Sequence, residues 1–215
     1  MQFYLIRHGQ TDWNIGRRIQ GETDVPLNAR GRLQAEAAGR AMREVPVDAI
    51  YSSDLSRALE TARAVSRLHD GGPLPVTPLR EFEEVSFGEW EGMSLDEVRE
   101  KWPELFARWK QNATAVTPPG GETPDEVRER VSRGFQKIGA DWEKTPFSSA
   151  VITAHGAVLE YIFDWLLRNA SEHREIIVEN ASISRISYDY ATEEGRILEL
   201  NRVDHLGELR GKKLV

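Results

Sequence analysis

Two histidines stand where a strand is expected to end, and a glycine follows each of them. The apolar run Phe3–Ile6 is typical of a buried strand, and only Arg7 separates it from His8. Residues 150–154 form a second, mostly apolar run, and His155 follows it directly. Ligands in open α/β sheets bind beyond the carboxyl ends of the strands. We therefore expect the two histidines to face each other at one site, the alternative for each being an ordinary loop or packing residue.

Side chains that could bind an anion lie near these histidines. Arg7 precedes His8, and the polar loop that follows contains Asn14. Arg57 stands in the first turn of a helix that is expected to begin after residues 52–54. A cation there opposes the helix dipole, and such a local conflict often marks a functional position, although an ordinary surface arginine is the alternative. Guanidinium groups match the oxygens of phosphate or carboxylate.

Together these groups predict a site for a phosphate monoester. Two arginines beside two histidines repel one another unless an anion lies between them. The sequence has no P-loop and no nucleotide-binding fingerprint, and its carboxylates and histidines show no convincing metal-ligand spacing. We therefore expect phosphoryl transfer without a metal or other cofactor, in which positioning and electrostatics supply most of the acceleration.

Alternating strand and helix patterns predict the elements that position these residues. They indicate an α/β fold with three layers, α/β/α, and a mostly parallel sheet of about six strands with helices on both faces. Apolar residues at every fourth position from Leu33 to Val45 indicate one amphipathic helix with that face buried. We expect residues 1–215 to form a single domain, with a helical insert at about 88–122 over the site.

Composition argues against several classes of function. The 215 residues are 40% hydrophobic and 29% charged, as in globular proteins. The net charge of −7 disfavours a nucleic-acid partner. No apolar run approaches the roughly 20 residues of a membrane span, and there is no signal-peptide pattern and no cysteine. We expect a cytoplasmic protein without membrane contact, and the oligomeric state is open, with a homodimer as one alternative.

A series of short motifs runs along the chain. The motifs are Arg7-His8-Gly9-Gln10-Thr11, Trp13-Asn14, Gln20-Gly21, Asp24 with Pro26-Leu27, Tyr51-Ser52-Ser53-Asp54-Leu55-Ser56-Arg57-Ala58 with Glu60-Thr61-Ala62, Phe87-Gly88-Glu89-Trp90-Glu91-Gly92, and His155-Gly156. In this order, over about residues 3–205, they resemble the histidine phosphatase superfamily, the phosphoglycerate mutase-like proteins. One Arg-His-Gly is weak evidence for that family, whereas the whole series is specific.

The resemblance implies a role for each matching residue. His8 would be the nucleophile that becomes phosphohistidine, and a glutamate shortly before Phe87 would give a proton to the leaving oxygen. The nucleophilic imidazole must be neutral, and neighbouring cations lower its pKa. Residues that would contact the phosphoryl group or the rest of the substrate are Arg7, Asn14, Gln20, Gly21, Arg57 and His155.

The motif leaves the proton donor open. The common family pattern is Leu-Arg-Glu, three further residues and Gly, and residues 79–81 match its first part. Counting back from Gly88 selects Glu84 instead, so the sequence contains an apparent extension of two residues. We favour Glu84 because its distance to the glycine turn should fix the direction of the side chain. Glu81 and Glu83 are the alternatives.

The family contains phosphatases and cofactor-dependent phosphoglycerate mutases. Family mutases carry extra basic residues in a longer insert, whereas acidic residues balance the basic ones of this insert. Asn201, His205 and Leu206 resemble a C-terminal pattern that is frequent among the phosphatases. We expect a phosphoric monoester hydrolase acting on a small phosphorylated substrate, with a mutase as the first alternative and an inactive binding or scaffold protein as the second. Aromatic residues expected either to form an apolar wall for the substrate or to pack the insert are Trp90, Trp102, Phe106 and Trp109.

Overall fold

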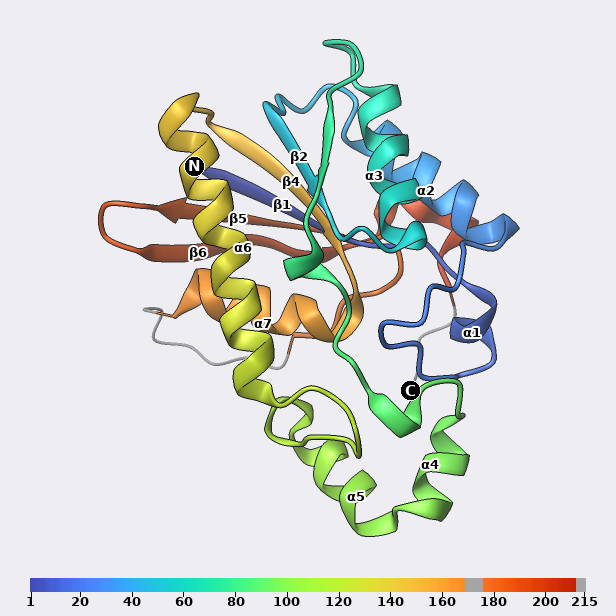
Figure 1. Cartoon of the computed structure of the whole chain (residues 1–215). Helices are drawn as coiled ribbons and strands as arrows, with labels where there is room; N and C mark the ends of the chain where they lie inside the picture. The colour runs from blue at the N-terminus through green and yellow to red at the C-terminus, as the bar shows by residue number, and fades with distance from the viewer. Residues whose placement is uncertain (169–175, 212–215) are drawn as a thin grey trace.

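A single sheet of six strands forms the centre of the molecule (Figure 1). The computed structural model describes residues 1–168 and 176–211. The strands are β1 (Gln2–Arg7), β2 (Ala49–Ser52), β3 (Val76–Pro78), β4 (Ser149–Ala154), β5 (Ile183–Asp189) and β6 (Glu194–Arg202), in the order β3-β2-β4-β1-β5-β6. The first four strands are parallel to one another, and β5 and β6 are antiparallel to their neighbours. The predicted α/β fold with a mostly parallel sheet is confirmed.

Helices cover both faces of the sheet. The α-helices are α1 (Asp12–Ile15), α2 (Ala29–Ala41), α3 (Ser56–Leu68), α4 (Leu95–Lys101), α5 (Pro103–Gln111), α6 (Pro124–Lys144) and α7 (Gly156–Leu167), and the 3-10 helices are η1 (Arg80–Phe82), η2 (Gly88–Trp90), η3 (Ala113–Ala115) and η4 (Asp204–Leu209). Figure 1 shows α2 and α3 on one side of the strands and α6 and α7 on the other, with α4 and α5 below these layers. Within the described residues, no helix is both long and apolar enough to cross a membrane.

The central strand β1 supplies side chains to both cores. Phe3 and Leu5 pack in the core that contains residues of α6 and α7, whereas Tyr4 and Ile6 pack in the core that contains residues of α2 and α3. A strand that is buried on both faces has a continuous apolar sequence, as this one has. The sheet therefore fixes the carboxyl end of β1, where His8 follows.

Small residues bring α2 close to α3. Leu33, which the periodicity places on the buried face, is 50% exposed, so the prediction is wrong for this residue. Ala35 and Ala38 are buried instead. A Cβ atom added to Gly39 would lie 2.7 Å from the carbonyl oxygen of Ala64, which leaves no room for a larger side chain. The period of four placed a leucine at the start of the buried face, whereas this close helix contact requires small residues such as Ala38 and Gly39.

Candidate active site

The imidazole of His8 is buried at the end of β1 and has a fixed orientation. Its Nδ1 lies 2.6 Å from the carbonyl oxygen of Gly9. A proton on Nδ1 donates this hydrogen bond, so the lone pair stays on Nε2. Burial, followed by the positive charges of Arg57 and Arg7, lowers the pKa of His8 well below its ordinary value of 6.5. Near neutral pH the ring is therefore uncharged and has a nucleophilic Nε2.

The glycine after His8 is required by the packing around it. The backbone N–H of Gly9 donates to Oγ1 of Thr61 on α3 at 3.2 Å. A Cβ atom on Gly9 would lie 2.3 Å from the carbonyl oxygen of Gly31 on α2. The His-Gly pair thus fits a place where the strand end, α2 and α3 meet.

The second histidine lies across from the first, as the sequence predicts. The ring centroids of His8 and His155 are 5.1 Å apart, and the rings are inclined by 55°. Nε of Arg57 donates to Nδ1 of His155 at 3.1 Å, so Nε2 of His155 carries the proton and donates to Oγ of Ser53 at 2.8 Å. Burial, followed by the charge of Arg57, lowers the pKa of His155 well below its ordinary value. This ring is also neutral.

Two guanidinium groups lie beside the histidines and donate hydrogen bonds to backbone carbonyls. The two Nη atoms of Arg57 donate to the carbonyl oxygens of Thr23 and Gly21, each at 2.8 Å. Nη1 of Arg7 donates to the carbonyl oxygen of Val178 at 2.8 Å. Nε of Arg7 is buried and has no hydrogen-bond partner in the described part of the chain. Burial lowers the pKa of both arginines from the ordinary value, so an anion at this position would be favoured.

The loop after His8 presents two amide side chains. Oδ1 of Asn14 accepts from the backbone N–H of Thr11 at 3.0 Å and from Nδ2 of Asn180 at 3.2 Å. These bonds orient the NH₂ group of Asn14, whose side chain lines the pocket. Oε1 of Gln20 accepts from Oγ1 of Thr11 at 2.9 Å. The protein thus uses the acceptor oxygens of both amides and leaves donors for a ligand.

Gly21 adopts a left-handed conformation with φ of +55°. A Cβ atom there would lie 1.9 Å from a carboxylate oxygen of Glu91. That carboxylate accepts from the backbone N–H groups of Glu22 and Thr23 at 3.1 Å and from that of Phe87 at 3.0 Å. Glu91 therefore holds the loop around Gly21 against the segment that begins at Phe87.

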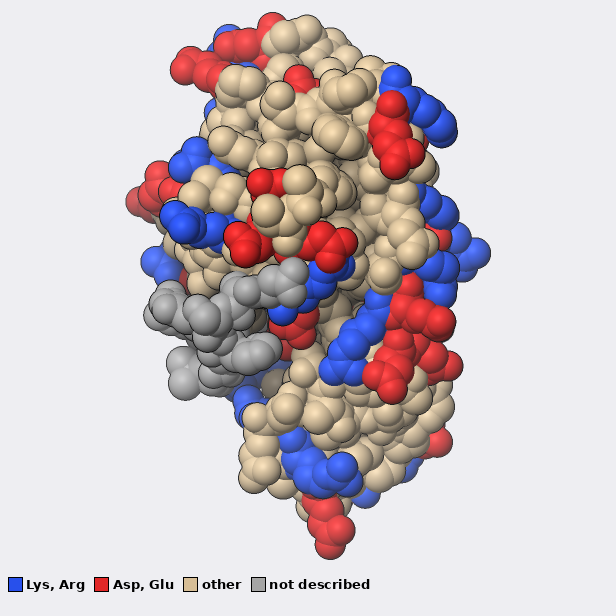
Figure 2. All heavy atoms as spheres, turned by 90° about the vertical axis from the view of Figure 1, so that its left-hand side faces the viewer, with Lys and Arg blue, Asp and Glu red and all other residues tan. Residues whose placement is uncertain are grey.

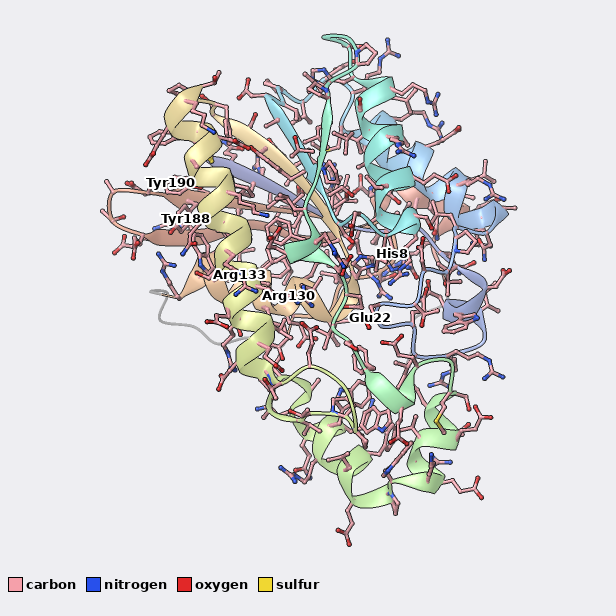
Figure 3. The ribbon with its side chains drawn as sticks, viewed as in Figure 1. His8, Glu22, Arg130, Arg133, Tyr188 and Tyr190 are labelled. Carbon is pink, nitrogen blue, oxygen red and sulfur yellow. The ribbon has the colours of Figure 1, made fainter. Side chains whose placement is uncertain are left out.

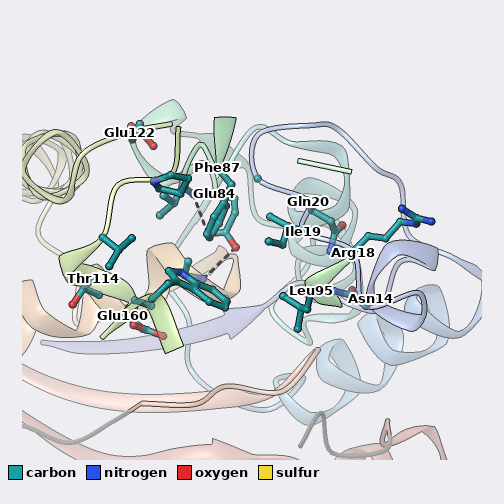
Figure 4. A pocket seen from close by; sticks show the side chains of 18 of the residues that line it. Asn14, Arg18, Ile19, Gln20, Glu84, Phe87, Leu95, Thr114, Glu122 and Glu160 are labelled. Carbon is teal, nitrogen blue, oxygen red and sulfur yellow. Dashed lines mark hydrogen bonds between the residues drawn. The ribbon is translucent and has the colours of Figure 1, made fainter. Parts of the chain in front are cut away.

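These groups open into one pocket of about 320 Å³ (Figure 4). Figure 4 shows Arg18 and Gln20 on one side of the pocket and Glu84, Phe87 and Glu160 on the other. The sequence-predicted residues that line it are Arg7, His8, Asn14, Gln20, Gly21, Arg57 and Glu84. His155 is fully buried beside His8 and does not line the pocket, so a direct contact with a ligand requires one ring nitrogen to leave its present partner.

Of the three acidic candidates, Glu84 lines the pocket. Its carboxylate accepts from the backbone N–H groups of Val158 at 2.8 Å and Ala157 at 3.2 Å. Both belong to the first turn of α7, and a helix N-terminus attracts a carboxylate. These bonds fix the direction of the side chain, and its place in the pocket makes Glu84 the candidate that could exchange a proton with a ligand.

The other two glutamates lie outside the pocket lining. The carboxylate of Glu81 pairs with Nζ of Lys137 at 2.6 Å. Glu83 lies beside Asp54 and 3.5 Å from Nε of Arg80. Burial and the Asp54 carboxylate raise the pKa of Glu83 to about 7. A perturbed pKa often marks a catalytic acid, but here it arises from burial and the Asp54 carboxylate at a position outside the pocket lining.

The aromatic residues of the insert serve both predicted purposes. Trp109 lines the pocket together with Phe87, and their ring centroids are 6.3 Å apart. Trp90 is fully buried, and its ring centroid lies 6.2 Å from that of Trp102 and 5.8 Å from that of Trp109. Phe106 packs against Trp109 with centroids 5.8 Å apart. Trp109 thus forms part of an apolar wall, and the other three pack the insert.

A segment before β5 takes part in the site, although no side-chain pattern singled it out. Val178 supplies the carbonyl that Arg7 binds. Nδ2 of Asn180 donates to the carbonyl oxygen of His8 at 3.1 Å, in addition to its bond with Asn14. Residues 178–180 therefore link the strand-end histidine to the loop that follows it.

Asn201 and His205 hold this segment in place. Oδ1 of Asn201 accepts from the backbone N–H of Glu179 at 2.8 Å, and Nε2 of His205 lies 2.9 Å from the carbonyl oxygen of Ala181. Their contribution to the site is therefore indirect, because both side chains bond to the backbone of residues 179–181.

Comparisons with known proteins agree with this geometry. The family model described as the histidine phosphatase superfamily (branch 1) matches residues 3–202. The uncharacterized phosphatase PhoE of Bacillus subtilis (strain 168) is 32% identical over 203 residues, which are 94% of this chain and 95% of that protein. Phosphoglycerate mutase-like protein 4 of Arabidopsis thaliana is 33% identical over 187 residues, which are 86% of this chain and 79% of that protein.

A solved structure supports the same family assignment. The mycobacterial glucosyl-3-phosphoglycerate phosphatase, in its complex with VO3, superposes with a TM-score of 0.81 at 28% identity, and the match covers 94% of this chain and 99% of that one. The resemblance carried by the sequence motifs is thus confirmed along nearly the whole length. The chain belongs to the histidine phosphatase superfamily.

Proposed function

We propose that the chain hydrolyses small phosphomonoesters through a covalent phosphohistidine on His8. The observation that carries this proposal is the neutral His8 ring, with its lone pair on Nε2, beside the guanidinium groups of Arg7 and Arg57. A nucleophile next to guanidinium donors suits a tetrahedral anion that must be bound and attacked. The superfamily and the phosphatases among its members support this reaction class.

In the first half-reaction, the lone pair on Nε2 of His8 forms a bond to phosphorus, and the bond between phosphorus and the ester oxygen breaks. Arg7, Arg57 and the NH₂ group of Asn14 stabilise the charge on the phosphoryl oxygens, with His155 orienting Arg57. The leaving oxygen takes its proton from the carboxyl group of Glu84. The Glu84 carboxylate and the substrate phosphate would repel each other in one pocket. A proton shared between Glu84 and the leaving oxygen therefore lowers the energy of the complex.

In the second half-reaction, a water molecule attacks phosphorus and the bond to Nε2 breaks. Glu84, now a carboxylate, takes a proton from the water, and the electron pair returns to the His8 ring. Orthophosphate leaves, and both side chains regain their starting protonation states. The chain supplies every group that these steps use, and we therefore propose that hydrolysis needs no metal.

The rest of the pocket suits a small organic group. A volume of about 320 Å³ lies at the lower end of the range for small-molecule sites. We infer that the phosphate binds at the strand ends, with Gln20 and Gly21 near it, and that the organic part packs against Phe87 and Trp109. We also infer that residues 1–215 act as one domain, in which the insert at 88–122 supplies part of this wall.

The test is the release of phosphate from p-nitrophenyl phosphate by the wild type and by His8→Ala, with a metal chelator present. We expect release by the wild type and a loss of at least about 10³-fold in His8→Ala, because nucleophile substitutions are that costly. His69→Ala is the matched control, since His69 lies at the end of α3 with its Nε2 3.2 Å from the carbonyl oxygen of Val45. This control should keep the wild-type rate.

A second measurement identifies the intermediate. Protein that is mixed with ³²P-labelled substrate and denatured rapidly should carry label that acid removes and alkali preserves, as a phosphorus–nitrogen bond requires. Activity that survives in His8→Ala would exclude the phosphohistidine on His8. A wild type that releases no phosphate but interconverts 3- and 2-phosphoglycerate would be a mutase, and one that does neither would be a binding protein.

A further inference from the structure

We propose that Arg130 is a positioning residue that directs Glu84 toward the ester oxygen of the substrate. The inference rests on the proposed function, because it concerns the proton donor of that reaction. Residues 83–87 lie between the short helices η1 and η2 and belong to no strand or helix. A catalytic carboxyl group on irregular backbone needs other contacts to hold its direction.

The guanidinium group of Arg130 supplies these contacts on one side of Glu84. Arg130 lies on α6, and its side chain is only 11% exposed. Its Nη1 donates to the carbonyl oxygens of Glu81 at 3.0 Å and Glu83 at 2.8 Å. Its Nη2 donates to the carbonyl oxygen of Glu84 at 3.1 Å. One planar group thus binds three carbonyls of the segment that carries the acid.

The partner of Arg130 extends these contacts to the other side of Glu84. Nε and Nη2 of Arg130 donate to the two carboxylate oxygens of Glu122 at 2.7 and 2.9 Å. One of those oxygens accepts from the backbone N–H of Ser86 at 2.9 Å. The backbone is therefore held at residues 81, 83, 84 and 86, while the Glu84 carboxylate is held by the first turn of α7.

These contacts require an arginine. The donors of a guanidinium group form a rigid planar fork, which can bind a carboxylate through two bonds while other N–H groups reach carbonyls. A lysine has one nitrogen and cannot make all five bonds in this arrangement. Arg130 is not among the residues that line the pocket, so it acts on a substrate through the segment it holds and through Glu122, which does line the pocket.

The choice of substrate separates positioning from simple stabilisation of the fold. Nitrophenolate is a weak base and leaves without a proton, whereas the alkoxide from glycerol 2-phosphate needs one. A misdirected Glu84 should therefore slow glycerol 2-phosphate hydrolysis selectively. A loss of folded protein should slow both substrates by the same factor.

The experiment compares kcat for the two substrates in Arg130→Lys and Arg130→Met. A misplacement of the acid by about 1 Å can cost about 100-fold. We expect kcat for glycerol 2-phosphate to fall at least about 10-fold more than kcat for p-nitrophenyl phosphate, within the contribution of general acid catalysis. Arg133→Met is the matched control, because Arg133 lies on the same helix with a side chain that is 54% exposed (Figure 3).

A double substitution tests whether Arg130 acts through Glu84. On glycerol 2-phosphate, Arg130→Lys added to Glu84→Gln should cause no further loss, because residues that act as one unit are not additive. Equal losses on both substrates, or full additivity of the two changes, would overturn the role of Arg130. If Arg130→Met does not fold, the ratio of the two kcat values in Arg130→Lys gives the answer. Activity retained by His8→Ala would instead reject the proposed function itself.

Discussion

At the scale of single residues, the reaction depends on which atoms the protein has already engaged. Nδ1 of His8 is bonded to a carbonyl, and Oδ1 of Asn14 accepts two donors. The groups left toward a ligand are Nε2 of His8 and the NH₂ group of Asn14, and the side chain of Arg7 lines the same pocket. The site thus offers one lone pair and several donors, which is the set that nucleophilic attack on a bound phosphate needs.

The effect of a glutamate-to-glutamine change on kcat should depend on which glutamate is replaced. Glu84→Gln should lower kcat for glycerol 2-phosphate by about 10²-fold or more, since an amide cannot protonate the leaving oxygen. Glu81→Gln should stay near the wild-type rate, because Glu81 pairs with Lys137 outside the pocket lining. Steady-state kinetics on the purified variants measures both, and the opposite pattern would make Glu81 the acid.

Much of the site could be predicted from residue types, and the remainder could not for a physical reason. His8, Arg57 and His155 stand in recognisable motifs at strand ends and helix starts. Arg130 and Asn180 act mainly on backbone carbonyls, which every residue has, so no side-chain pattern identifies their partners. Only the folded chain shows that these residues reach the site.

At the scale of elements, the start of α2 packs closely against the loop that follows the nucleophile His8. The backbone N–H of Asn28 donates to the carbonyl oxygen of Gln10 at 3.0 Å. A Cβ atom on Gly31 would lie 2.0 Å from the same oxygen. The apolar runs in the sequence predicted β1 and β4 well. The contact between α2 and the loop could not be predicted in this way, because it joins two stretches of backbone and the periodicity of side chains does not detect it.

Two glycine-to-alanine changes test this contact. Gly31→Ala should destabilise the protein by about 1–3 kcal/mol, as overpacking does, and lower kcat by moving the loop beside His8. Gly139→Ala should stabilise it by about 0.5–1 kcal/mol, because Gly139 lies inside α6 with no atom within 4 Å of an added Cβ. Urea unfolding and phosphate release measure both variants. If Gly31→Ala keeps wild-type stability and rate, α2 does not constrain the loop.

At the scale of the whole molecule, an acidic chain encloses a cationic site. The net charge is −7, and acidic and basic side chains are interspersed on the face shown in Figure 2. Charges on the surface are screened beyond about 8 Å at physiological salt. Arg57 is fully buried and Arg7 lines the pocket, and the charges of both lower the pKa values of His8 and His155. The fold brings these groups together from the ends of β1 and β4 and the start of α3.

Because two neutral histidines lie beside two cations, the free energy of unfolding of the protein should fall in acid. The pKa values of His8 and His155 are well below 6.5 in the folded state, whereas those of unfolded histidines are near 6.5. Below pH 6.5 the unfolded chain therefore binds more protons than the folded one. The free energy of unfolding should fall by about 1.4 kcal/mol per pH unit for each of them until the pH reaches the folded pKa.

The variant His155→Gln isolates one of these contributions. Its free energy of unfolding, measured by urea titration at several pH values between 7.5 and 5.5, should depend less steeply on pH than that of the wild type. The difference in slope below pH 6.5 should approach about 1.4 kcal/mol per unit, while the slopes above pH 7 should coincide. Carboxylates titrate in both proteins and cancel in the comparison. Equal slopes below pH 6.5 would mean that folded His155 accepts a proton as readily as the unfolded chain does, and that the cations around it do not keep it neutral.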